Sequence, residues 1–253
     1  MYVYQCEDTL ESVFTAIYRV YEEHRPQDEV LLTLDDEPHL FAEHIKVEKD
    51  PERSEKVAST LCKRFGMEDY ERICLALTTP DMEKAQAVYR TIASGLALQK
   101  GCAYGRLFEN LGDTMVCRAL KLARNAEREC GHLKGFLRFA ELDKGALYAQ
   151  AKPKNNLLPF LMAHFADRFP EENFMICDEG RKIAGVHYKQ GGTEEWILFD
   201  GRMDMPEQFA EEEKYYQNLF RRFCGDIGIR ERANIALQRS LLPLHFRKYM
   251  TEF

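Results

Sequence analysis

The feature that most restricts the fold is a change in the spacing of apolar residues near residue 135. Before this point apolar residues recur mainly at helical intervals, and after it they fall into short strand-like runs. The helical segments are 50–66, 68–77, 81–99 and 113–131, and the strand-like runs are 136–142, 146–152, 174–177, 183–188 and 196–199. Helical spacing returns beyond residue 207. This order predicts an α+β fold, because a Rossmann-type or barrel fold would need regular alternation of strands and helices.

The predicted architecture has a helix-rich N-terminal part, a mostly antiparallel sheet that carries one buried helix, and a helical C-terminal tail. The buried helix is expected at 157–169, because that segment is apolar almost all round. We expect an N-terminal region over residues 1–112 and an α+β region over 113–253 that holds a basic helix, the sheet and a basic helical tail. One continuous domain is the alternative.

Two helix starts are marked clearly in the N-terminal region. Asp8 or Thr9 can cap a helix whose apolar stripe follows, and the pair Asp50-Pro51 combines a capping residue with proline at the first helical position. Three short β-prone runs, at 2–5, 29–34 and 45–47, precede the second of these helices. The front of the chain is therefore not helical throughout.

The charge of the chain is unevenly distributed. The 253 residues carry a formal net charge of −7. The last 40 residues, 214–253, hold eight Lys/Arg against three Asp/Glu, a net of +5. An acidic front with a basic tail indicates different partners for the two ends. The start of the chain lacks a basic segment followed by a long apolar run, and no window suits a membrane helix, so we expect a cytoplasmic protein.

The cysteines give no sign of a metal site. None of the eight is spaced as CxxC, and their neighbours are mainly apolar, so they are best interpreted as small buried hydrophobic residues. The histidines form no HxxxH pattern, and no P-loop, GxSxG or GxGxxG occurs. The sequence therefore predicts neither a metal nor a cofactor, and it names no reaction.

A cationic stripe marks the segment from Arg118 to Phe139. On a helix its basic residues fall on one side and its apolar residues on the other. The basic side holds Arg118, Lys121, Arg124, Arg128 and His132, and the apolar side holds Met115, Leu122, Ala126, Cys130 and Leu133. Such a stripe suits contact with phosphates. The alternative, equally weighted, is a solvated outer face whose cations pair with Glu127 and Glu129.

A second basic region lies in the C-terminal tail, where cations alternate with aromatic residues. The cations are Arg221, Arg222, Arg230, Arg232, Arg239, Arg247 and Lys248, and the aromatics are Phe220, Phe223, Phe246 and Tyr249. Arginine beside aromatics is typical of surfaces that bind nucleic acid. For the aromatics, however, we favour a role in docking the tail onto the core.

A smaller set of polar residues offers candidates for catalysis. His164, Asp167 and Arg168 lie on the apolar helix expected at 157–169, where buried polar groups need partners. His132 and Asp178 complete the set. A pocket formed by these five would suit an enzyme acting on a nucleotide or nucleic acid. For these residues we favour structural roles: a network in which Arg168 pairs with Asp167 or Asp178, and capping of a helix end by His132.

Three segments together resemble one known family. They are 123–139, with a basic helix, a histidine and a strand ending in Arg-Phe; 155–178, with a His-Phe pair, an Arg-Phe pair and an aspartate; and 229–252, which closes on Thr-Glu. They resemble a bacterial domain of unknown function known as "probable DNA metabolism protein". This chain has Leu-Pro-Leu-His-Phe around Pro243, where the family usually has Met-Pro-x-x-Tyr-Trp. The aromatic contact of the tail therefore differs.

The resemblance implies work on DNA but supplies no catalytic residue. The family occurs beside a radical-SAM DNA modification or repair protein and is also fused to uracil-DNA glycosylase-like domains. We therefore expect a DNA-associated accessory protein of DNA modification or repair. It would bind nucleic acid, or the radical-SAM partner, through its basic helix and tail arginines. An enzyme that uses the His/Asp/Arg set is the alternative.

Overall fold

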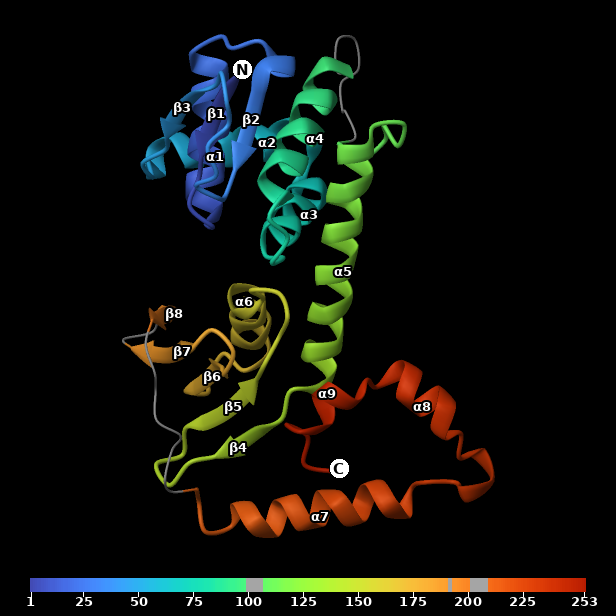
Figure 1. The fold of residues 1–253 in the computed structure, drawn as a ribbon. Helices are drawn as coiled ribbons and strands as arrows, with labels where there is room; N and C mark the ends of the chain where they lie inside the picture. Colours follow the sequence, from blue (N-terminus) through green and yellow to red (C-terminus); the bar gives the residue numbers. More distant parts are fainter. Residues whose placement is uncertain (99–106, 191–192, 201–208) are drawn as a thin grey trace. The chain divides into compact units, whose positions relative to one another are not determined.

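The computed structural model describes residues 1–98, 107–190, 193–200 and 209–253. It divides into two compact units, Met1–Glu127 and Arg128–Phe253, and the boundary falls within the long helix α5, Thr114–Phe136 (Figure 1). Each unit has its own sheet. The α+β class predicted from the sequence is confirmed.

The first unit is built on a small parallel sheet. Its strands are β1 (Tyr2–Gln5), β2 (Val30–Thr33) and β3 (Glu43–Lys46), in the order β2-β1-β3. Both pairings of β1 are parallel. Parallel neighbours need a crossover, and helix α1 (Leu10–Glu22) with the short 3-10 turn Gln27–Glu29 supplies the one between β1 and β2. The sequence marked these strands but did not predict their assembly into one parallel sheet.

Helices complete the first unit: α2 (Pro51–Phe65), α3 (Met67–Leu77) and α4 (Lys84–Leu98). Two predicted starts are confirmed, because the Thr9 side chain accepts a hydrogen bond from Ser12 N and Asp50 accepts one from Arg53 N at 3.1 Å. The helices pack with the sheet into one apolar cluster that includes the first turns of α5.

The second unit contains a five-stranded sheet in the order β4-β5-β6-β7-β8. The strands are β4 (Phe139–Glu141), β5 (Leu147–Ala151), β6 (Phe174–Asp178), β7 (Ile183–Gln190) and β8 (Thr193–Asp200). All pairings are antiparallel except β5 with β6, which α6 (Leu158–Arg168) connects. The mostly antiparallel sheet with its helix is thus as predicted.

Helix α6 buries one face rather than its whole surface. Leu161, Met162 and Phe165 are buried, whereas Asp167 and Arg168 at its end are exposed. A Cβ atom at Gly185 of β7 would collide with the Met162 side chain. The absence of a side chain at Gly185 therefore lets α6 approach the sheet closely.

The tail is helical, as expected, and consists of α7 (Glu213–Asp226), a 3-10 turn at Arg230–Arg232, α8 (Ile235–Leu241) and α9 (Leu244–Arg247). Its end is fixed by Arg138, whose Nη2 and Nε atoms lie 2.6 and 3.2 Å from the two carboxylate oxygens of Glu252. Such bidentate pairs are directional and strong. Among the described residues, no helix has the length and apolar character needed to cross a membrane.

A buried carboxylate fixes the last turns of α5. Glu129 is 8% exposed and accepts hydrogen bonds from the backbone N–H groups of Lys154 (2.8 Å) and Asn155 (3.0 Å) and from Asn155 Nδ2 (2.7 Å). On the other side of the same loop, Arg181 donates to the carbonyl oxygens of Pro153 and Lys154. The loop before α6 is therefore held through its backbone N–H groups, which bond to Glu129, and through its carbonyl oxygens, which accept from Arg181.

We predict that Glu129→Ala destabilises the protein by roughly 3 kcal/mol, because it leaves buried donors without an ionised acceptor. A thermal melt should show a midpoint lowered by about 6–12 °C. Glu127→Ala is the matched control, since Glu127 is exposed and has no ion pair within the described chain. Equal midpoints for the two variants would contradict the role given to Glu129.

Candidate functional site

Buried residues recur along α5 at alternating intervals of three and four. They are Val116, Ala119, Ala123, Ala126, Cys130 and Leu133, all buried. Three of these belong to the predicted apolar face, whereas Met115 and Leu122 of that prediction lie half-buried at its margin. This regular seam determines which residues of α5 point to solvent.

The opposite side of α5 presents three free cations. Lys121, Arg124 and Arg128 are exposed, and within the described chain none of them forms an ion pair. Glu129 is turned inward to the loop before α6, and Glu127 has no ion pair within the same residues. The pairing with these two glutamates that would have neutralised the stripe is therefore not formed.

Arg118 departs from the predicted row. Its Nη2 atom lies 3.0 and 2.8 Å from the two carboxylate oxygens of Asp81, and Nη1 forms a further ion pair with Glu83. The hydrogen bond to Asp81 raises the pKa of the guanidinium, which stays charged but is neutralised locally. Arg118 is thus a structural contact rather than an open cation.

His132 also lies apart from the open cations. Its ring is half-buried, at 5.6 Å from the ring of Phe246 in an edge-on arrangement and at 5.5 Å from that of Phe136. This aromatic cluster packs α9 against the end of α5. The histidine serves here as an apolar ring, so the structure gives no support to an acid–base role.

Asp178, another candidate for catalysis, is a buried structural residue. Asp178 is 2% exposed and accepts hydrogen bonds from Gly180 N and from the backbone and side chain of Arg181. It therefore anchors the turn after β6. The expected network of Asp178 forms with Arg181 and not with Arg168.

The polar residues of α6 do not form the buried pair expected from the sequence. Asp167 and Arg168 are exposed, and the Arg168 guanidinium lies 5.6 Å from the Phe169 ring. Burial, with the nearby charges of Lys134 and Arg168, lowers the pKa of His164. The imidazole is thus neutral near pH 7. We find no arrangement that brings His132, His164, Asp167, Arg168 and Asp178 together.

The tail cations divide into open and engaged groups. Arg232 and Arg239 are exposed and form no ion pair within the described residues. Lys248 is 3.1 Å from Glu179, whose hydrogen bond raises the pKa of the lysine. Arg247 is half-buried with its guanidinium 4.5 Å from the Phe253 ring. The side chain of Arg230 lies outside the described residues.

The tail aromatics behave in two ways. Phe246 is 6% exposed, and Tyr249 donates a hydrogen bond to Glu179, so the prediction that aromatics dock the tail is confirmed for these two. It is wrong for Phe223, which is 55% exposed, whereas Phe220 is 37% exposed and its ring lies 5.8 Å from the Arg138 guanidinium. Helical spacing revealed their common face but could not show whether anything covers it.

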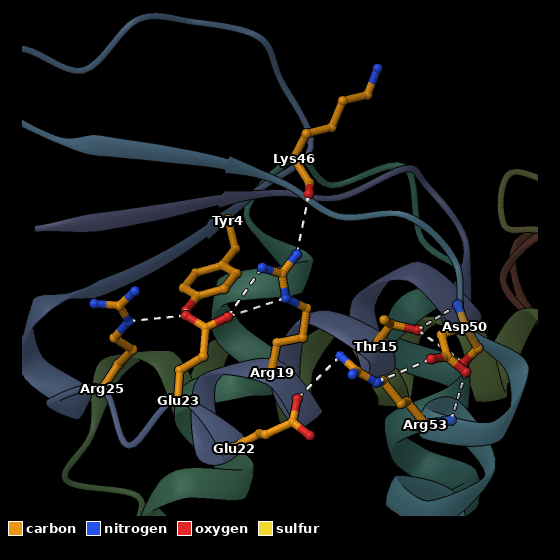
Figure 2. Close-up of polar contacts among 9 residues, drawn as sticks. All are labelled: Tyr4, Thr15, Arg19, Glu22, Glu23, Arg25, Lys46, Asp50 and Arg53. Atoms are coloured by element: carbon orange, nitrogen blue, oxygen red, sulfur yellow. Dashed lines mark hydrogen bonds and ion pairs between the residues drawn. The ribbon is translucent and has the colours of Figure 1, made fainter.

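A polar cleft in the first unit was not predicted. It has a volume of about 590 Å³ and is lined mainly by charged side chains: Arg19, Glu22, Glu23, Lys46, Glu48, Lys49, Asp50 and Arg53, with Thr15 and Pro51. Figure 2 shows most of its contacts. These residues come from two short segments, 15–23 and 46–53, that carry no motif, so no pattern in the chain could have indicated that the two segments form a cleft.

Glu23 is the centre of this network. It accepts hydrogen bonds from Tyr4 Oη at 2.8 Å, from Arg25 Nε at 3.0 Å and from Arg19 Nη2 at 3.1 Å, while Arg19 also donates to the carbonyl oxygen of Lys46 (Figure 2). The network joins α1 to β1 and β3. Because its charges are largely satisfied by one another, we interpret it as structural.

No metal site emerges from the described part of the chain, where no three His, Cys, Asp or Glu residues gather closely enough to hold an ion.

Comparison with known proteins establishes the family. The profile of a domain of unknown function, DUF4130, matches residues 82–252, more than half of the chain. The chain belongs to the DUF4130 family. No curated protein and no solved structure matches it. The matched range includes α5, the second sheet and the tail of this DUF4130 protein, but not the polar cleft. The family description assigns no function, so a DNA-related role is a proposal.

The contacts of Glu23 predict a pH-dependent contribution to stability. Burial alone would raise its pKa, but hydrogen bonds from Tyr4, Arg25 and Arg19 lower it below the ordinary value. Stabilisation by the charged form is therefore present above the unfolded pKa of about 4.3 and is lost as pH falls through the lower folded value.

We expect Glu23→Gln to lower the urea midpoint at pH 7 and to differ less from the wild type as pH falls below about 4. Glu48→Gln is the control, because Glu48 is exposed and has no ion pair among the described residues. A Glu23→Gln effect that is the same at pH 3 and pH 7 would rule out the charge as its source.

Proposed function

We propose that this protein is a nucleic-acid-binding accessory protein that works in DNA modification or repair. The observation that carries the proposal is the row of three exposed, unpaired cations on α5: Lys121, Arg124 and Arg128. A chain with a net charge of −7 does not present such a row through a general excess of cations. Cations that stay free of neighbouring carboxylates suit a partner that carries phosphates.

The spacing of the row fits a nucleic-acid backbone. At a rise of 1.5 Å per residue, Lys121 and Arg128 are separated by roughly 10 Å along the helix axis. This is about three nucleotides of one strand at 3.4 Å each. The two guanidinium groups can each bind a phosphate through two N–H donors. Three adjacent phosphates are thus within the reach of one helix face.

The tail adds further cations of the same kind. Arg222, Arg232 and Arg239 are exposed and unpaired among the described residues. The resemblance to proteins found beside a radical-SAM enzyme and fused to uracil-DNA glycosylase-like domains supports DNA as the nucleic acid. The radical-SAM protein is part of the proposal as a partner that acts on the same DNA.

Binding is a better proposal than catalysis for this protein. The five candidate catalytic residues lie in separate surroundings, and Asp178 is fully engaged with Arg181 and its own turn. None of them lines the polar cleft of the first unit. An active site requires its groups to converge where a substrate can reach them.

We predict that the protein binds DNA at low salt and that Arg124→Ala/Arg128→Ala weakens binding roughly tenfold. Loss of two phosphate contacts should also make the slope of log affinity against log salt shallower by about 1.4–1.8. Fluorescence anisotropy with a labelled DNA at several salt concentrations measures both quantities. Lys63→Ala/Lys144→Ala is the matched control, because both lysines are exposed and unpaired in the described structure.

Three results would reject the proposal: no binding by the wild type at low salt, equal binding by the arginine and lysine double variants, or a slope that the arginine variant leaves unchanged. Co-purification of the protein with the radical-SAM partner after nuclease treatment, with no affinity for DNA, would instead indicate a protein adaptor.

A further inference from the structure

Helix α7 is attached to the second unit by its polar side. Glu213 Oε2 accepts a hydrogen bond from Glu141 N at 2.9 Å, and Arg221 Nε donates to the carbonyl oxygen of Thr251 at 2.7 Å. Glu213, Gln217 and Cys224, on one side of the helix, are its least exposed residues. No residue of α7 is buried by the described part of the chain.

Most of the apolar stripe of α7 points away from the residues that hold the helix, but Phe220, at one edge of the stripe, lies with its ring 5.8 Å from the Arg138 guanidinium of the second unit. The members of the stripe share one face at helical spacing. They are Tyr215 (66% exposed), Tyr216 (53%), Leu219 (49%), Phe220 (37%), Phe223 (55%) and Ile227 (60%). At 150–250 Å² for a whole aromatic side chain, the four aromatics alone expose on the order of 400 Å². A patch of this size matches the largest apolar patch of a typical monomeric protein, and such patches are often functional.

The composition of the stripe indicates what binds there. Four of its six residues are aromatic, whereas aromatics form 11% of the chain. At 100° per residue, Arg222 lies about 20° from Tyr215, at the border of the stripe. Arg222 is exposed and has no ion pair among the described residues. Flat rings bordered by a free guanidinium suit bases for stacking and phosphates for charge.

The charge of the region selects this ligand over a second copy of the chain. From the first residue of α7 to the end of the chain, residues 213–253 hold eight Lys/Arg against four Asp/Glu, a net charge of +4, so two such tails would repel each other. A nucleic acid supplies the opposite charge. Duplex DNA hides the faces of its bases within the stack, so only a strand with unpaired bases can use rings in this way.

We propose that α7 is a stacking platform for the unpaired bases of a single-stranded nucleic acid. This inference rests on the proposed function, because it takes the ligand to be a nucleic acid, and adds the form in which that ligand is bound. Tyr216 and Phe223 lie near the centre of the stripe, two turns apart, and Arg222 binds the backbone beside them. The cations of α5 contact phosphates and do not distinguish the two forms.

The test compares two labelled probes by fluorescence anisotropy with the full chain. One is an oligodeoxythymidylate of roughly 20 nucleotides, longer than the 4–16 nucleotides that a single-strand-binding domain usually covers, and the other is a mixed-sequence duplex of the same length. We expect tighter binding of the single strand. Tyr216→Leu/Phe223→Leu should weaken single-strand binding at least tenfold and leave duplex binding unchanged.

The choice of leucine separates stacking from general apolar contact, because leucine keeps an apolar side chain and removes the ring. Tyr216→Phe/Phe223→Tyr keeps both rings and should bind as the wild type does. Phe41→Ala is the matched control, since Phe41 is a fully exposed aromatic in the first unit. Circular dichroism and light scattering verify that each variant is folded and give its molar mass.

Equal affinity for the two probes, or wild-type binding by the leucine variant, would overturn the inference. The proposed function would still stand if Arg124→Ala/Arg128→Ala weakened binding of both probes. Absence of binding to either probe would reject both proposals. If the leucine variant changed only the molar mass in solution, the stripe would be a contact between copies of the chain, and the platform would be rejected.

Discussion

The rotation of α5 about its own axis depends on one buried carboxylate. Glu129 accepts three hydrogen bonds from the loop before α6, and it can do so only if its side of the helix faces that loop. Successive residues on a helix are 100° apart, so Cys130 lies on one side of Glu129, where it is buried, and Arg128 lies on the other side, where it is exposed. The buried Glu129 carboxylate thereby helps to determine which cations of α5 are exposed and available for binding.

The contrast between Arg118 and Arg124 shows what helical periodicity can and cannot predict. Both arginines fall on the face that the sequence marked as cationic. Asp81 and Glu83 are more than 30 positions away along the chain, yet they pair with Arg118, whereas no described carboxylate reaches Arg124. Periodicity gives the direction of a side chain from its own helix, but the groups that meet it come from other segments. The number of open cations is therefore a tertiary property.

Local signals predicted most elements of this fold, because caps, prolines and turns act over a few residues. Thr9 and Asp50 cap their helices as expected, and the hairpin between β4 and β5 turns at Asp143–Gly145. The parallel pairing of β1 with β2 and β3 was not predictable in this way, since parallel strands meet through long crossovers. Nor was the cleft around Glu23, whose partners are brought together only by the folded sheet and α1.

Helix α7 is attached by its polar side and leaves its apolar stripe exposed, and this arrangement argues for a ligand that covers the stripe. The helix is held by two hydrogen bonds to charged side chains, which contribute about 1.5–3 kcal/mol each, and by the contact of Phe220 with Arg138. Covering roughly 400 Å² of apolar surface at 25 cal/mol per Å² would contribute on the order of 10 kcal/mol, an upper estimate. A helix that gains so little from its own chain gains more from what binds its outer face. The same reasoning applies to α5, whose free cations have no described carboxylate to pair with. Both helices therefore expose groups that lack a partner in the described chain: apolar side chains on α7 and cations on α5.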